Sequence, residues 1–150
     1  MILSDSSILL AIKKNDIVIE PYDRDCLGTN SYDVHLSRYL ACYVDDVIDA
    51  KKHNKVERFE ISKEGIVLRP GKTYLGATEE YTETREYVPF LEGKSSVGRL
   101  GIDIHATAGK GDVGFCNHFH FRCCLLYYLD LLSYVQLVAY RGCFHSKTSK

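Results

Sequence analysis

The 150-residue sequence predicts a mostly-β domain with one short helix at its N-terminus. Two observations support this fold class. Short runs of β-branched and aromatic residues follow one another and are separated by turn signals such as Pro70-Gly71. A helical pattern is found only near the start, where Ile8, Leu9 and Ile12 share one face.

The elements are expected in a simple order. A helix capped by Ser4 or Asp5 ends near Lys14, because the apolar spacing stops there. Short strands then follow at 17–19, 31–44, 59–61, 66–68, 74–77, 88–91 and, after one helical turn at 97–100, at 102–106. The glutamates of the segment EEYTETREY, namely Glu79, Glu80, Glu83 and Glu86, are expected to form a solvated face.

The last third has a different character. Residues 119–140 form an apolar run about as long as a membrane span. Asp130 near its middle, together with Arg122 and Gln136, makes insertion into a bilayer costly. We therefore expect a buried strand or helix here, followed by a loose polar tail.

Composition narrows the function classes. A formal net charge of -1 gives no overall attraction for nucleic acid or membranes, so cations that meet an anionic ligand must be placed locally. None of the six cysteines forms a C-x-x-C pair, and no signal peptide precedes the helix. Reduced thiols and a cytoplasmic location are the expectation.

The most informative stretch is EGKSSVGRLGIDIHATAGKGDVGFCN at 92–117. Lys94, Ser95, Ser96 and Arg99 bring two cations and two hydroxyls together at the start of a short helical turn, where phosphate oxygens can be bound. A glycine-rich loop follows, and Asp112 in it could accept hydrogen bonds from a sugar hydroxyl. Spacing alone leaves an ordinary solvated turn equally open.

This stretch resembles the core signature of the dCTP deaminase family, in which Arg/Lys-Ser-Ser-x-x-Arg-x-Gly precedes a strand and a Thr-Ala-x-x-x-Asp-x-Gly loop. The start MILSD, the run Asn30–Leu36 and the turn Leu68–Gly71 also resemble that family and occur in the same order. The resemblance covers about residues 1–117. We therefore expect one domain, 1–150, with a family-like core at 1–117 and an atypical segment at 118–150.

The resemblance implies a β-clip fold shared with trimeric dUTPases, a distorted barrel, and a homotrimer with sites between subunits. It also implies a hydrolase that converts dCTP, carried with Mg²⁺, to dUTP and ammonia. Lys94, Ser95, Ser96 and Arg99 would contact the triphosphate, and Ser95, Arg99 and Ala108 would surround the reacting end. Asp112 would meet the deoxyribose, and His105 and Thr107 would line the strand beneath.

The zinc-deaminase signature, His-x-Glu followed by Pro-Cys-x-x-Cys, is absent from the sequence. A deaminase without zinc needs a side chain as general base, and a carboxylate in a partly buried site suits this role. In the family a glutamate at the end of a Thr-Leu-Glu triplet has it. Counted without gaps, the triplet falls on His120, Phe121 and Arg122, the first two at nucleotide-binding positions.

Arg122 cannot accept a proton, so the resemblance predicts an impaired enzyme. The family pattern fades after Asn117, which suggests a shifted reading frame, a truncation or a divergent end. His105, His118 or His120 could replace the base, whereas Asp103 should point away from the site. A dUTPase-like hydrolase and a catalytically inactive nucleotide-binding subunit remain open as alternatives.

Overall fold

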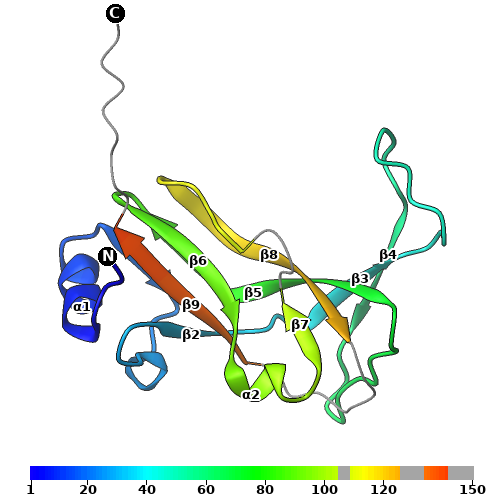
Figure 1. The fold of residues 1–150 in the computed structure, drawn as a ribbon, viewed down its shortest axis with the longest axis horizontal. Coiled ribbons are helices and arrows are strands. Elements are labelled where there is room, and N and C mark those ends of the chain that lie inside the picture. The colour runs from blue at the N-terminus through cyan, green and yellow to red at the C-terminus, as the bar shows by residue number, and fades with distance from the viewer. Residues whose placement is uncertain (105–108, 126–133, 142–150) are drawn as a thin grey trace, which may run out of the picture.

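The computed structural model describes residues 1–104, 109–125 and 134–141, with side chains described as far as residue 119. Within these residues a six-stranded sheet and a three-stranded sheet form an elongated molecule, with helix α1 at one end (Figure 1). The expected mostly-β class with an N-terminal helix is confirmed. The strands described do not close into one continuous barrel.

Helix α1, Asp5–Lys13, forms where the sequence predicts it. Ser4 is the N-cap, and its side chain accepts a hydrogen bond from the backbone N–H of Ser7. Asp5 in the first turn and Lys13 in the last turn complement the helix dipole. Ile8 and Ala11 are buried, so the helix covers one end of the sheets with its apolar face.

Strand β5, Thr73–Thr84, organises the larger sheet. It pairs with β1 (Ile17–Glu20), β3 (Tyr39–Tyr43) and β8 (Phe115–Leu125), all antiparallel. Strand β4 (Val56–Glu60) lies beyond β3, and β7 (Ile102–Ile104) lies beyond β8. A register shift between Ala77 and Tyr81 marks a bulge in β5 opposite β8.

The smaller sheet has the order β2-β9-β6, with β2 at Tyr32–His35, β9 at Tyr134–Arg141 and β6 at Tyr87–Gly93. A 3-10 turn, η1, at Arg24–Cys26 precedes β2, and the short helix α2, Ser95–Gly98, follows β6 directly. The end of β6 therefore positions α2.

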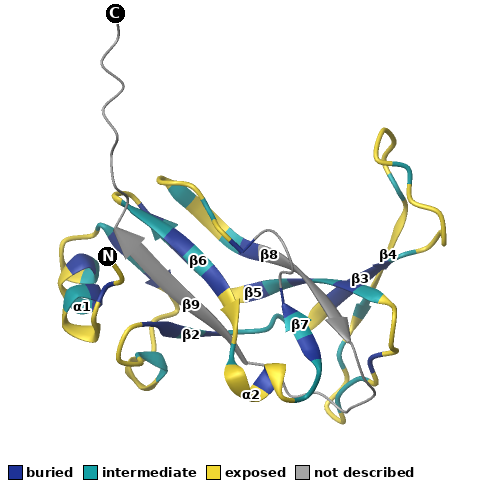
Figure 2. Cartoon of the chain, viewed as in Figure 1, coloured by how far each residue is buried: buried dark blue, intermediate teal, exposed yellow. Residues whose placement is uncertain are grey.

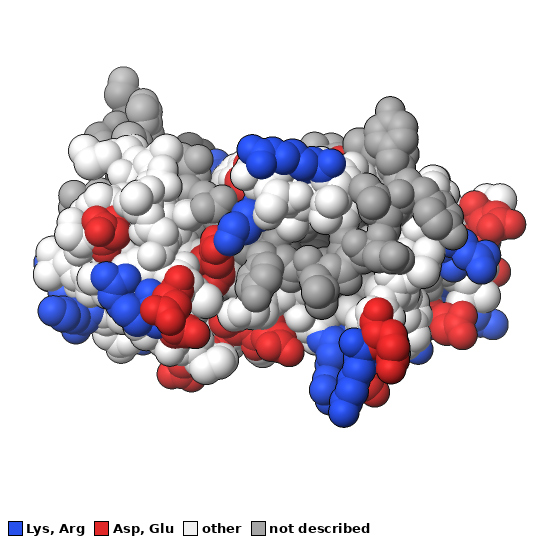
Figure 3. Space-filling view, turned by 90° about the horizontal axis from the view of Figure 1, so that it is seen from below, with Lys and Arg blue, Asp and Glu red and all other residues white. Residues whose placement is uncertain are grey.

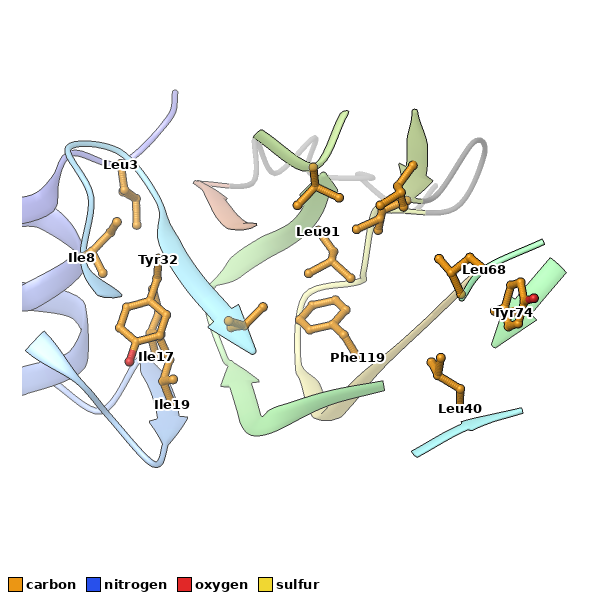
Figure 4. Close-up of a cluster of buried hydrophobic side chains, with 14 of the residues drawn as sticks. Leu3, Ile8, Ile17, Ile19, Tyr32, Leu40, Leu68, Tyr74, Leu91 and Phe119 are labelled. Carbon is orange, nitrogen blue, oxygen red and sulfur yellow. The ribbon is translucent and has the colours of Figure 1, made fainter. Parts of the chain in front are cut away.

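The core runs between the two sheets and under α1 (Figures 2 and 4). Figure 4 shows Leu3, Ile8 and Tyr32 on the side of α1, and Leu40, Leu68 and Tyr74 at the opposite end. Leu91 and Phe119 lie between these groups. Phe119 also stacks on Phe115, with ring centroids 4.1 Å apart.

Several expected elements differ from the structure. The helical turn expected at 97–100 lies two residues earlier, at Ser95–Gly98. The strand expected at 66–68 is reduced to an isolated bridge residue, Val67, although Leu68 is fully buried. The glutamate segment is not a solvated face throughout, because β5 continues to Thr84 and its period-two alternation turns Glu80 inward with Thr78 and Thr82. Glu80 is only 3% exposed.

The backbone does not change character at Asn117, although the family pattern in the sequence fades there. Strand β8 continues to Leu125, and β5 pairs with it from His120 to Cys124. The physical reason is that this stretch is rich in aromatic residues and has β5 on one side and β7 on the other. The expected strand or helix at 119–140 is thus a pair of strands in the residues described.

Among the described residues, no helix is long and apolar enough to cross a membrane. Cys26, Cys42 and Cys116, which belong to the same part of the chain, are free thiols.

Candidate functional site

Helix α2 is a single turn whose sequence explains its shape. Val97 donates the first hydrogen bond of the turn, to the carbonyl of Lys94 at 2.9 Å. The backbone N–H groups of Ser95 and Ser96 therefore precede the helix's own hydrogen bonds, as the first amides of any helix do. Gly101, with φ of 74°, then reverses the chain into β7, a conformation that favours glycine.

This turn has one buried side chain, that of Val97, and several exposed ones (Figure 2). Val97 is 3% exposed, and Leu100 packs against the core. Ser95, Ser96 and Arg99 are exposed, and Lys94 is half-buried. Two exposed hydroxyls and a guanidinium thus belong to one short turn, together with the first two amides of the helix, and form a set of donors suited to phosphate oxygens.

The ammonium of Lys94 forms an ion pair with a carboxylate oxygen of Asp33 on β2. This contact joins α2 to the neighbouring sheet. Asp33 lies on the face of β2 opposite to the buried side chains of Tyr32 and Val34. The sequence motif contained Asp33, but we assigned it no role.

His35, two residues along β2, pairs with the buried carboxylate of Glu80. The backbone N–H of His35 donates to Glu80 Oε2 at 2.8 Å, and His35 Nδ1 lies 2.5 Å from Glu80 Oε1. Thr78 completes the bulge by donating to the Glu80 carbonyl at 2.9 Å and accepting from the N–H of Phe119 at 3.1 Å. Alternation along β5 is the signal that could have identified Glu80 as buried.

Cys26 lies near these carboxylates. Burial, and then the negative charges of Asp23, Glu80 and Asp33, raise the pKa of its thiol above the usual value. The thiol is therefore protonated at neutral pH and is a poor nucleophile.

The glycine-rich loop packs on β6. Gly111 donates to the carbonyl of Pro89 at 2.9 Å, and a Cβ at Gly111 would lie 2.8 Å from the Pro89 ring. Glycine is thus required here for contact with β6, whereas we expected the loop to approach a ligand. From Pro89 to Gly93 the strand advances roughly 13 Å, so exposed Asp112 and α2 lie at different ends of β6.

Several expected site residues fall outside the description. His105, Thr107 and Ala108 lie outside the described residues. His120, Phe121 and Arg122 lie on β8, where the backbone of Arg122 pairs with Leu75, but their side chains are not described. Asp103 is half-buried between buried Ile102 and Ile104, which agrees with its expected direction away from their face.

Charges on this side of the molecule are mixed. Viewed from below Figure 1, the side on which α2 lies, the basic and acidic side chains of the described residues are interspersed and form no single basic patch (Figure 3). The described residues contain no cluster of three histidine, cysteine, aspartate or glutamate side chains able to hold a metal ion. The cations that flank α2 itself are Lys94 at its N-cap and Arg99 at its C-cap.

Residues 2–124 match the model of a family described as dCTP deaminase-like. The chain belongs to the dCTP deaminase family. The match includes β8 through Cys124, somewhat beyond the 117 residues in which the sequence motifs occur.

Curated relatives agree with this assignment. The chain is 55% identical over 119 residues to "dCTP deaminase, dUMP-forming" of Clostridium acetobutylicum, covering 79% of this chain and 68% of the relative. It is 45% identical over 137 residues to the protein of the same name in Leptospira biflexa, covering 91% and 78%.

The fold agrees as well. A crystal structure of 2'-deoxycytidine 5'-triphosphate deaminase from Agrobacterium tumefaciens superposes with a TM-score of 0.72 at 18% identity. The superposition covers 94% of this chain and 48% of that one, so this dCTP deaminase family member spans about half of that structure. The expected dCTP deaminase fold is confirmed.

The names of the relatives correct one expectation about this deaminase family member. We expected a hydrolase that releases dUTP and ammonia. The relatives are named as dUMP-forming, so the expected product was wrong. The error arose because the resemblance of the motifs at 94–112 to the family carries no information about the fate of the triphosphate.

Proposed function

We propose that the chain binds deoxynucleoside triphosphates of the dCTP type through the exposed face of α2. The observation that carries this proposal is the separation within one turn between buried Val97 and exposed Ser95, Ser96 and Arg99. Buried Val97 fixes the turn, and the exposed donors point outward from a backbone that does not need to reorganise.

Mg²⁺ would accompany the triphosphate and neutralise part of its charge. The described residues offer no ready-made set of three acidic ligands, so phosphate oxygens would supply most of the coordination. We propose that the chain works without zinc. The resemblance to the family implies a reaction in which a side chain is the general base.

The complete site is proposed to form between copies of the chain in a homotrimer. Asp112 follows Gly111, which binds Pro89 near one end of β6, whereas α2 begins at the other end, and this separation supports contributions from different subunits to one nucleotide. Light scattering of the purified chain would measure the mass of the assembly.

The free thiols of Cys26, Cys42 and Cys116 support the cytoplasm as the location of the chain.

The reaction of the named relatives, from dCTP to dUMP, requires two bonds to break. Water must replace the amino group at C4, and a second water must release pyrophosphate, which gives dUMP, ammonia and pyrophosphate. For this chain we propose that the first step is strongly impaired, because Arg122 stands at the position that the resemblance assigns to the general base.

The expected result with Mg²⁺ and dCTP is binding with little ammonia. General-base assistance contributes on the order of 10²–10⁴ in rate, so ammonia release should fall at least that far below that of the Clostridium acetobutylicum relative. Arg122→Glu alone should recover little, and an exchange of residues 118–150 for the relative's end should recover turnover. Ammonia release equal to the relative's would refute the impairment.

Two alternatives are separated by the same assay. Pyrophosphate released from dUTP without any ammonia from dCTP would support a dUTPase-like hydrolase. Heat of dCTP binding in a calorimeter without either product would support an inactive nucleotide-binding subunit, which the arginine at position 122 favours.

A further inference from the structure

The ion pair between Lys94 and Asp33 bears on how α2 binds a triphosphate. Asp33 projects from the outer face of β2, and the Lys94 ammonium at the start of α2 pairs with it. The side chains of Lys94 and Asp33 are 37% and 22% exposed, whereas those of the pair Arg38–Glu60 are 65% and 53% exposed. The Lys94–Asp33 pair is therefore the less screened of the two.

Asp33 is itself held in place. Tyr32 and Val34, on either side of it, are buried in the core, and β2 pairs with β9. His35 next along the strand is fixed by two contacts to the buried carboxylate of Glu80. A carboxylate on such a strand can restrict a lysine, whose long side chain otherwise loses about 2 kcal/mol of rotamer entropy when it is ordered.

We propose that Asp33 is a positioning residue that holds the Lys94 ammonium beside the first turn of α2 before the nucleotide arrives. An ammonium has three N–H donors, so contact with a carboxylate oxygen does not exclude contact with a phosphate oxygen. Asp33 thereby raises the affinity for the triphosphate without touching it, because the lysine is ordered in advance. This inference rests on the proposed nucleotide site.

The test compares the binding of Mg²⁺-dCTP and dCMP by calorimetry. Asp33→Asn removes the charge of the partner and should weaken dCTP binding about three- to tenfold, but dCMP binding less than twofold. Lys94→Met should weaken dCTP binding at least as much. The double variant should be no weaker than Lys94→Met alone, because Asp33 acts through Lys94.

Glu60→Gln is the matched control. It makes the same change in net charge and also removes the carboxylate of an ion pair, but on β4, and should change dCTP affinity less than twofold. Asp33→Ser should repeat the result of Asp33→Asn, so a folding defect in one variant does not decide the question.

Four results would overturn the inference. Tighter dCTP binding by Asp33→Asn would mean that the carboxylate repels the phosphates. Equal losses for dCTP and dCMP, or additive losses in the double variant, would mean that the pair only fastens β2 to α2. No change relative to the unmodified chain would leave Asp33 without a role, whereas absence of dCTP binding by the unmodified chain would refute the nucleotide site itself.

Discussion

Three buried threonines on one face of β5 show that buried hydroxyls can have opposite effects on the free energy of unfolding. Thr78 donates to the Glu80 carbonyl and accepts from the N–H of Phe119. The hydroxyls of Thr82 and Thr84 have no hydrogen-bond partner among the described residues, although both side chains are fully buried. A hydroxyl buried without a partner costs free energy, and one that bridges two strands stabilises them.

We therefore expect Thr82→Val to raise the free energy of unfolding by about 1 kcal/mol, since it removes the unpaired hydroxyl at nearly constant volume. Thr78→Val should lower it by about 1–3 kcal/mol, because the N–H of Phe119 and the carbonyl of Glu80 lose their partner. Urea denaturation of both variants measures the difference. Equal destabilisation by the two would contradict the expectation.

Tyr32 gives the fold a dependence on alkaline pH. Its hydroxyl oxygen accepts a hydrogen bond from the N–H of Asp23 at 2.7 Å, and burial raises its pKa to about 12. The folded state keeps this proton more tightly than the unfolded state, whose pKa is about 10. The stabilising effect is thus complete below pH 10 and is lost as the pH rises through 12.

Relative to Tyr32→Phe, which cannot ionise, the unmodified chain should lose up to about 2–3 kcal/mol of unfolding free energy between pH 10 and pH 12. Below pH 9 the unmodified chain should be more stable, because the variant leaves the Asp23 N–H without its acceptor. Denaturation curves at a series of pH values measure both effects. A constant difference across the range would show that Tyr32 does not ionise in this window.

At the scale of elements, β6 and the segments packed on it determine where the candidate site lies. One end of β6 continues into α2, and the carbonyl of Pro89 near the other end receives the N–H of Gly111. The requirement for glycine differs between these ends. A Cβ at Gly111 would meet the Pro89 ring at 2.8 Å, but one at Gly98 would have no heavy atom within 4 Å from the described residues outside α2.

Gly111→Ala should therefore lower the free energy of unfolding by about 1–3 kcal/mol, since the proline ring cannot move aside without shifting β6. Gly98→Ala should raise it by about 0.5–1 kcal/mol, because alanine favours the helical turn. Thermal unfolding of the two variants gives the comparison. A Gly111→Ala variant as stable as Gly98→Ala would mean that the loop does not pack on Pro89.

Local sequence patterns were sufficient to predict many of the helices and strands. Ser4 as a cap and the apolar face of α1 follow from the spacing of a few residues, as does a helical turn after Lys94, although the turn lies at 95–98 and was expected at 97–100. What the sequence did not reveal depends on distant partners. The ion pair of Glu80 needs His35, and that of Lys94 needs Asp33, and a local window contains neither partner.

At the scale of the whole molecule, the pairing of β9 joins distant parts of the chain. It pairs with β2 through Tyr32–Leu137 and with β6 through Leu91–Leu137, so one strand holds both of the others in the smaller sheet. Strand β2 carries Asp33, and β6 leads to Lys94. The geometry between these two charges therefore depends on a third strand that contains neither of them.

A chain that ends after residue 133 should lose cooperative unfolding, because β2 and β6 lose the backbone hydrogen bonds to their shared partner. A chain that ends after Arg141 keeps β9 and should unfold at a temperature within a few degrees of the full chain. Circular dichroism during heating measures both. A cooperative transition in the shorter chain would show that the larger sheet is stable without β9.

The order in which the strands are synthesised determines when β9 can pair with β2 and β6. The ribosome makes β2 early and β6 later, and β9, which lies between them in the sheet, follows both in the sequence. Domains usually begin to fold from the N-terminus during synthesis, and here one edge of β2 and one edge of β6 remain unpaired until residues 134–141 have been made. The newly made chain is therefore exposed to aggregation through these two edges until β9 pairs with them, and a chaperone that covers sheet edges would act in that interval.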